Sequence, residues 1–252
     1  TLTDNGGGAS SVDYGTLEGI VDSYQGRNSG VAFSFQDEDT IEVGNGEVAD
    51  YLTDIGNGAL ALTDQKVTVS GTTLSVADAK TIAADTTGLV TASIATGSRV
   101  SKLTELRTPD GENAEENAWT IAIAEADAES SAADLNTINA ATSAQVDASE
   151  VTTITSSSIS AIGTLLTSAV ATDPREFTTG SFDDLAALSV SDDTIDVTAL
   201  NTAITNANSV VAGGTVPVFT LSDTDATING GSEAEFESLM NVEGSAASDN
   251  ID

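Results

Sequence analysis

The sequence predicts a mixed α/β fold, an elongated solenoid in which short strands alternate with short helices. Three observations favour this fold: a recurring helix-capping motif, strand-like runs between the predicted helices, and a hydrophobic content made mostly of Ala, Val, Ile and Leu, with only 4% aromatic residues. Small side chains suit thin coils that bury their apolar faces against neighbouring coils. A β-rich protein with sandwich-like domains is the alternative.

The capping motif is a Ser followed three positions later by an acidic residue, with apolar residues four and seven positions after the Ser. At Ser131, the hydroxyl can accept from the free N–H groups of a helix start, and Asp134 can bond back to the cap N–H. Leu135 and Ile138 then share one helix face. The motif recurs roughly 50–56 residues apart, a spacing typical of stacked arrays, at Ser75/Asp78, Ser181/Asp184 and Ser232/Glu235, with a degenerate copy at Asp13. The repeat predicts that Leu135, Leu185 and Phe236 are buried in equivalent positions.

A second helix type lies between these caps and has apolar residues at about every third position. Its three copies contain Val100, Leu103 and Leu106; Ile159, Ile162 and Leu165; and Leu200, Ala203 and Ala207. Each predicted helix has about two or three turns and needs tertiary packing to be stable. Residues 48–55 are also expected to be helical. Partly alternating apolar residues predict strands at 31–35, 59–62, 66–69, 89–94, 119–124, 144–148, 195–197 and 216–221.

These elements divide the chain into three parts. Residues 1–71 are expected to form an N-terminal arm and atypical capping units, residues 72–243 the strand–helix array, and residues 244–252 a tail. Residues 108–117 and 171–180 contain turn signals and are expected to be insertions that project from one side of the array. Because the chain begins at Thr1 and shows no signal peptide, it is expected to be a processed product or a section of a larger protein.

The charge balance excludes several classes of partner and of chemistry. The chain has 7 Lys and Arg against 40 Asp and Glu, a formal charge of −33. Such a field repels nucleic acid and anionic lipid, and no apolar run is long enough to predict membrane insertion. The absence of Cys and His excludes disulfides, zinc–thiolate sites and Ser-His-Asp catalysis. Self-repulsion is expected to be screened by salt or by bound calcium.

Three carboxylate pairs at predicted turns are the candidate metal ligands. Calcium prefers hard oxygen ligands on flexible backbone, which the chain offers at Asp37, Asp39, Asp192, Asp193, Asp223 and Asp225. The spacing matches neither an EF-hand nor the nonapeptide repeat of calcium-binding β-helices, so solvated turns are the competing interpretation. Carboxylate pairs can also hydrolyse glycosides, but close pairs are expected by chance among 40 acidic residues. No catalytic or cofactor-binding residue is therefore predicted, and calcium is the one expected ion.

Two stretches resemble known repeats. Residues 69–94 (VSGTTLSVADAKTIAADTTGLVTASI) and 132–155 (AADLNTINAATSAQVDASEVTTIT) resemble the Ala/Thr-rich repeats of large surface and extracellular proteins of marine cyanobacteria, and of structural proteins of their phages. Residues 244–252 (GSAASDNID) resemble the opening of the calcium-binding repeats of secreted RTX proteins. The resemblance implies secretion or virion assembly, and scaffolding rather than catalysis.

The sequence therefore predicts a non-enzymatic structural subunit of an extracellular assembly, such as a filament, sheath or surface layer. The expected partner is another copy of the chain, bound through stacked ends or through the N-terminal arm. A phage tail fibre or capsid appendage, located in the virion, is the first alternative. A polysaccharide-active β-helix enzyme is the second.

Overall fold

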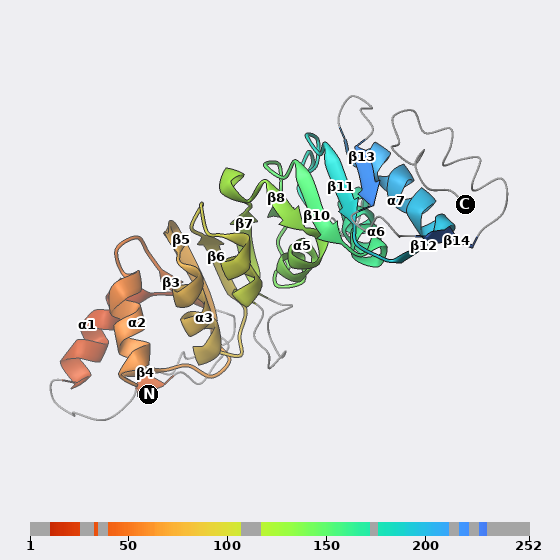
Figure 1. Cartoon of the computed structure of the whole chain (residues 1–252). Helices are drawn as coiled ribbons and strands as arrows, with labels where there is room; N and C mark the ends of the chain where they lie inside the picture. The colour runs from red at the N-terminus through yellow and green to blue at the C-terminus, as the bar shows by residue number, and fades with distance from the viewer. Residues whose placement is uncertain are drawn as a thin grey trace. The chain divides into compact units, whose positions relative to one another are not determined.

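The computed structural model describes residues 11–25, 33–34, 40–106, 117–171, 176–211, 217–221 and 227–230 (Figure 1). Helices alternate with strands along this part of the chain, and the strand pairs that it contains are parallel. The prediction of a mixed α/β fold is confirmed. The sandwich alternative is wrong, because sandwiches are built from antiparallel sheets. The chain separates into two compact units: unit 1 is Thr1–Ser98, Glu105–Ile121 and Ala140–Ala144, and unit 2 is Arg99–Thr104, Ala122–Asn139 and Gln145–Asp252.

Unit 1 is built on a parallel sheet whose strands join in chain order. These strands are β1 (Ser11–Asp13), β3 (Thr40–Val43), β5 (Lys66–Leu74), β6 (Val90–Ile94) and β7 (Ala118–Ala122). Parallel neighbours need a crossover connection, and three of the crossovers contain the helices α1 (Tyr14–Gln25), α2 (Val48–Gly56) and α3 (Val76–Asp85). A separate short pair joins β2 (Phe33–Ser34) to β4 (Leu60–Ala61). The turn Thr104–Leu106 is a 3-10 helix that follows α4 (Val100–Leu103).

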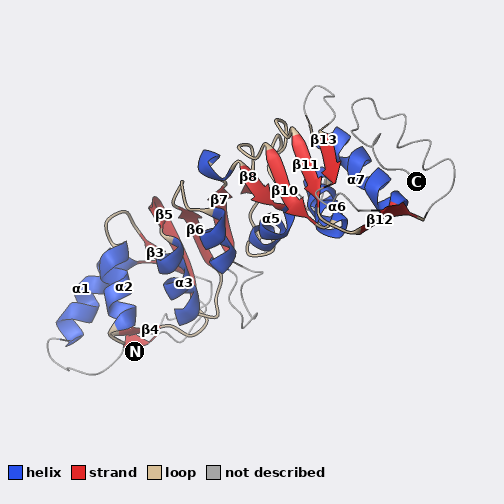
Figure 2. Cartoon of the chain, in the orientation of Figure 1, coloured by secondary structure: helices blue, strands red, loops and turns tan. Residues whose placement is uncertain are grey.

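Unit 2 repeats the same construction. Its sheet contains β8 (Glu129–Ser131), β10 (Thr153–Ser157), β11 (Ala187–Val190) and β13 (Val218–Leu221), again in chain order. Figure 2 shows these strands side by side, with the helices of the unit next to them. The helices are α4 (Val100–Leu103), α5 (Ala132–Asn139), α6 (Ile159–Val170) and α7 (Val197–Val210). The remaining elements are β9 (Val146–Asp147), the pair β12 (Thr194–Asp196) and β14 (Thr227–Asn229), and a 3-10 turn at Glu125–Asp127.

The apolar periodicity of the sequence correctly identifies residues that are buried in the core. The second helix type is confirmed, because all nine of its predicted apolar residues are buried: Val100, Leu103, Leu106, Ile159, Ile162, Leu165, Leu200, Ala203 and Ala207. Along β6, buried Val90, Ala92 and Ile94 alternate with half-buried residues, as expected for a strand with one face in the core. Since each helix is short, its stability depends on this burial rather than on helix propensity.

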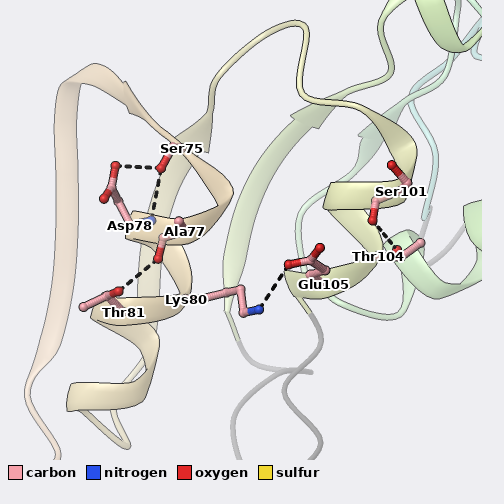
Figure 3. A network of polar contacts seen from close by, with 8 residues as sticks. All are labelled: Ser75, Ala77, Asp78, Lys80, Thr81, Ser101, Thr104 and Glu105. Atoms are coloured by element: carbon pink, nitrogen blue, oxygen red, sulfur yellow. Dashed lines mark hydrogen bonds and ion pairs between the residues drawn. The ribbon is translucent and has the colours of Figure 1, made fainter.

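Two of the predicted Ser caps lie at helix starts, and the degenerate copy at Asp13 also caps α1, where its Oδ1 accepts from the Thr16 N–H at 2.8 Å. Ser75 is the N-cap of α3, where its Oγ accepts from the Asp78 N–H at 3.1 Å (Figure 3). Ser131 does the same immediately before α5, accepting from the Asp134 N–H at 3.1 Å. In both motifs, however, the acidic side chain accepts from the Ser hydroxyl, at 2.7 Å from Ser75 and 2.8 Å from Ser131, rather than from the cap N–H. The hydroxyl therefore acts as acceptor and donor at once.

The prediction of a third cap at Ser181 is wrong. Residues 181–184 form turns, not the first turn of a helix, and the next helix begins at Val197. Ser181 is buried, and its Oγ accepts from the Ala148 N–H at 3.1 Å and donates to the Val146 carbonyl at 3.3 Å, so it links two segments instead of capping one. Leu185 is buried as expected, but it lies beside this turn and not on a helix equivalent to that of Leu135. Ser232, Glu235 and Phe236 lie outside the described residues.

Aromatic packing explains why residues 176–185 do not form a helix. Phe177 and Phe182 are both buried, and their rings meet edge to face with centroids 5.2 Å apart. Gly180, between them, has a φ of +85°, which a helix does not accommodate. Residues 181–184 therefore do not repeat the helix start found at Ser131, although each helix in the described ranges follows a strand.

Candidate functional site

Of the six carboxylates predicted to bind calcium, the structure describes Asp192 and Asp193. Asp37, Asp39, Asp223 and Asp225 lie outside the described residues. Asp192 lies between β11 and β12, and its Oδ2 accepts from the backbone N–H of Ile159 at 2.5 Å. The neighbouring Asp193 accepts from the Thr227 N–H through its backbone carbonyl at 2.9 Å. Among the residues described, no three Asp or Glu side chains are grouped as a metal site requires.

The bond from Ile159 to Asp192 is one of three in which a side chain of a later segment accepts from the first N–H group of an earlier helix. This bond covers the first N–H of α6. The first N–H of α5, at Ala132, is likewise bound by the Ser157 Oγ at 2.9 Å. The first N–H of α4, at Val100, is bound by the Asp127 Oδ2 at 3.1 Å. We call these three bonds the inter-segment caps; within each bond, the accepting residue follows the donor by 25 to 33 positions.

Helix starts in unit 2 also have caps from their own segments. Ser158 accepts from the Ala161 N–H at 3.2 Å at the start of α6, and Asp196 accepts from the Ala199 N–H at 3.0 Å at the start of α7. A helix leaves its first four N–H groups without intrahelical partners. In α6, one of these groups is bound locally and another by the following segment. Contacts between successive segments therefore bind free N–H groups at helix starts, in addition to pairing the strands of the sheet.

Buried and half-buried polar side chains bind backbone groups of neighbouring segments of unit 1 in a similar way. The Asn117 Oδ1 accepts from the Val90 N–H at 2.9 Å, and Thr142 bonds both the N–H and the carbonyl of Trp119, at 2.8 and 2.9 Å. Thr86 donates to the Gln65 carbonyl at 2.6 Å. Each of these bonds satisfies backbone groups that would otherwise be costly to bury. Their role is structural, since each has a backbone partner.

One pocket of about 310 Å³ lies in unit 2, between the C-terminal ends of α6 and α7 and the turn that contains Phe182. Asp183 is the only ionisable residue in its lining, which otherwise consists of apolar, Gly, Ser and Thr residues. The turn hydroxyl of Ser181 is already bound to Val146 and close to Thr178. Acid–base chemistry needs a second titratable group within reach of the first, and the lining does not supply one.

Two carboxylates of unit 1 have perturbed protonation. Burial raises the pKa of Asp85, whose Oδ2 is shielded from solvent and has no hydrogen-bond partner. The buried hydroxyl of Tyr51 also lacks a partner, and burial, followed by the charge of Asp85, raises the pKa of that phenol. Partial burial, followed by the charges of Asp50, Asp22, Asp54 and Glu47, raises the pKa of Glu18.

The inter-segment caps were missed by sequence reasoning, because the accepting residue and the helix are far apart in the chain and no fixed offset connects them. A signal does exist at Asp192 and Asp127, since each lies in a connection next to a strand, where an acidic side chain favours the N–H groups of a helix start. No helix in the described ranges is long and apolar enough to cross a membrane. Comparison of the chain with protein-family models, with characterised proteins and with solved structures found no match.

Proposed function

We propose that the chain is a non-enzymatic structural subunit that stacks with other copies of itself into an extracellular filament, sheath or surface layer. The observation that carries the proposal is that each segment supplies hydrogen bonds to backbone groups that the preceding segment leaves without partners. Within each unit, the strands of the main parallel sheet join in chain order, and in unit 2 a side chain of the later segment binds the first N–H group of the earlier helix. In such a solenoid-like construction each segment contacts only its neighbours, so the end of the stack can accept a further segment.

The outermost described strand of unit 2 offers a surface for this growth. β13 pairs with β11 on one side only, and its residues are less buried than those of β11. Val218 on β13 is 42% exposed, one of two large hydrophobic residues exposed to this degree among those described. An open edge strand presents free N–H and C=O groups that can pair with another chain. An acidic chain of charge −33 needs salt or divalent cations before two copies can approach.

The test is a comparison of assembly between the native chain and an edge variant. Electron microscopy and light scattering at high protein concentration, in saline buffer with calcium, should show ordered polymers or lattices of the native chain. Val218→Glu should abolish them, because it places a charge on the open edge. Asn208→Glu, which adds the same charge at an exposed position of α7, should not. A native chain that stays monomeric under these conditions would contradict the proposal.

A further inference from the structure

The tripeptide Gly-Asn-Gly occurs at both ends of helix α2, with Asn45 and Asn57 at its centres. Both Asn residues are exposed, and the glycines that follow them, Gly46 and Gly58, have positive φ values of +92° and +66°. An Asn side chain is open to attack by the next backbone nitrogen when a glycine follows, because glycine has no Cβ to obstruct the approach. The two sites match in local sequence and exposure, so a difference in their reactivity reports the fold.

The turn before α2 is held by its outer residues. The Glu47 N–H donates to the Gly44 carbonyl at 3.2 Å, and the Glu47 Oε2 accepts from the Gly44 N–H at 2.7 Å. Asn45 and Gly46 are the two central residues of this β-turn, whose third position favours glycine when its φ is positive. Attack on the Asn45 side chain requires rotation about its ψ angle, which acts on the bond that closes this turn.

The turn after α2 instead binds the reacting nitrogen itself. Asn57 is the C-cap of the helix, the Gly58 N–H donates to the Ile55 carbonyl at 3.1 Å, and the Ala59 N–H donates to the Asp54 carbonyl at 2.8 Å. These are the two bonds of a Schellman motif, with glycine at its left-handed position. The nitrogen that would attack the Asn57 side chain is therefore committed to the helix as a hydrogen-bond donor.

We propose that Asn45 is a site of spontaneous deamidation in the folded chain and that the helix end protects Asn57. The Gly46 nitrogen gives its proton to hydroxide and attacks the Asn45 Cγ. The N–Cγ bond forms, the Cγ–Nδ2 bond breaks, and the Nδ2 group takes a proton from water and leaves as ammonia. Water then opens the succinimide, at Cγ to give aspartate or at the backbone carbonyl carbon to give isoaspartate. This reaction does not depend on the proposed assembly.

Isoaspartate at position 45 disturbs the start of α2. It routes the main chain through the Cβ and Cγ of the residue, which adds one atom between positions 45 and 46. The Asn45 Cβ has little room to move, because a Cβ placed on Gly71 of β5 would lie 3.2 Å from it. The extra atom is therefore expected to displace Glu47, the N-cap residue of α2, and to weaken its two bonds to Gly44.

Peptide mapping by mass spectrometry follows both sites in one sample of the full chain. During incubation at pH 8, the acidic product at position 45 should accumulate several-fold faster than the product at position 57. The rate at position 45 should fall at pH 6, because less hydroxide is present. In concentrated urea the two rates should become similar, since the local sequences match. Equal rates in the native chain, a faster reaction at position 57, or a difference that persists in urea would overturn the proposal.

Two matched variants separate the sites and test the effect on α2. Asn45→Gln should abolish the product at position 45, because the longer side chain closes a ring far more slowly, whereas Asn57→Gln should leave that product unchanged. As isoaspartate accumulates in the native chain, amide exchange in the first turn of α2 should speed up several-fold. It should stay constant in Asn45→Gln, and in α6, whose sequence ISAIGTLLTSAV contains no Asn. Unchanged exchange of α2 after conversion would refute its proposed disturbance.

Discussion

Ser131 stabilises the start of α5 by accepting from the Asp134 N–H at 3.1 Å, at an exposed position. Replacing it with Ala should lower the free energy of unfolding by about 1 kcal/mol, the usual cost of losing an N-cap. Ser181 is different, because its buried Oγ binds the Ala148 N–H and the Val146 carbonyl. Ser181→Ala leaves that N–H without a partner and should cost about 1–3 kcal/mol. Urea denaturation measures both values.

The order of these two values is the informative result. Ser149→Ala is the control, since Ser149 is exposed and only its backbone N–H is bonded, to Asp147; it should change stability by less than about 0.5 kcal/mol. If Ser181→Ala cost no more than Ser131→Ala, the buried links that we assign to Ser181 would not exist in solution.

Asp85 should make unit 1 more stable in mild acid than at neutral pH. Burial raises its folded pKa above the unfolded value, so the folded state binds a proton more readily, and stability falls as the pH rises through the folded pKa. Asp85→Asn removes this ionisation and should raise the free energy of unfolding at pH 7. The gain should shrink near pH 4, and equal effects of the variant at both pH values would contradict the assignment.

At the scale of the helix, α5 illustrates how much stability depends on stacking. It has eight residues, too few for an isolated helix, and it contacts α4, α6, β8 and β10. Leu135 is fully buried among these neighbours. Leu135→Ala should cost about 2–5 kcal/mol, because it removes core contacts and leaves a cavity. Thr137→Ala, on the exposed side of the same helix, should stay within about 0.5 kcal/mol of the native stability, as measured by the same denaturation experiment.

The cap between Asp192 and Ile159 can be separated from a calcium site by experiment. If Asp192 acts as a helix cap, Asp192→Ala should cost about 1 kcal/mol and speed amide exchange in the first turn of α6. The loss should be equal in EDTA and in millimolar calcium. A loss seen only with calcium present would instead assign Asp192 to a metal site.

At the scale of the whole chain, a charge of −33 favours the unfolded state, in which the acidic side chains are farther apart. The melting temperature at pH 7 should therefore rise by several degrees between 0.01 M and 0.5 M NaCl, since about 1 kcal/mol corresponds to about 2–4 °C for a chain of this size. Circular dichroism at pH 4, where many carboxylates are neutral, should show a smaller rise. A melting temperature that is flat or falls with salt at pH 7 would show that the charges are too far apart to matter.

Local sequence determined the helices, three of the caps and the alternation of buried residues in β6. Each depends on residues no more than four positions apart, or on a simple period, as at Ser75, Ser131 and the apolar positions of α6. The acidity and the absence of His and Cys were also fixed by composition alone. Strands β8, β10 and β11 were missed, because short polar runs such as TITSS become strands only when a parallel neighbour pairs with them.

Only the tertiary structure decided which residues with the same local pattern share a role. Ser181 has the motif of Ser131, but packing of Phe177 against Phe182 holds it in a buried turn. The inter-segment caps likewise join residues more than 20 positions apart. Their partners are chosen by the register of the parallel sheet, which sets residue against residue across crossovers of variable length. Sequence spacing does not record those lengths, so these contacts had to be read from the fold.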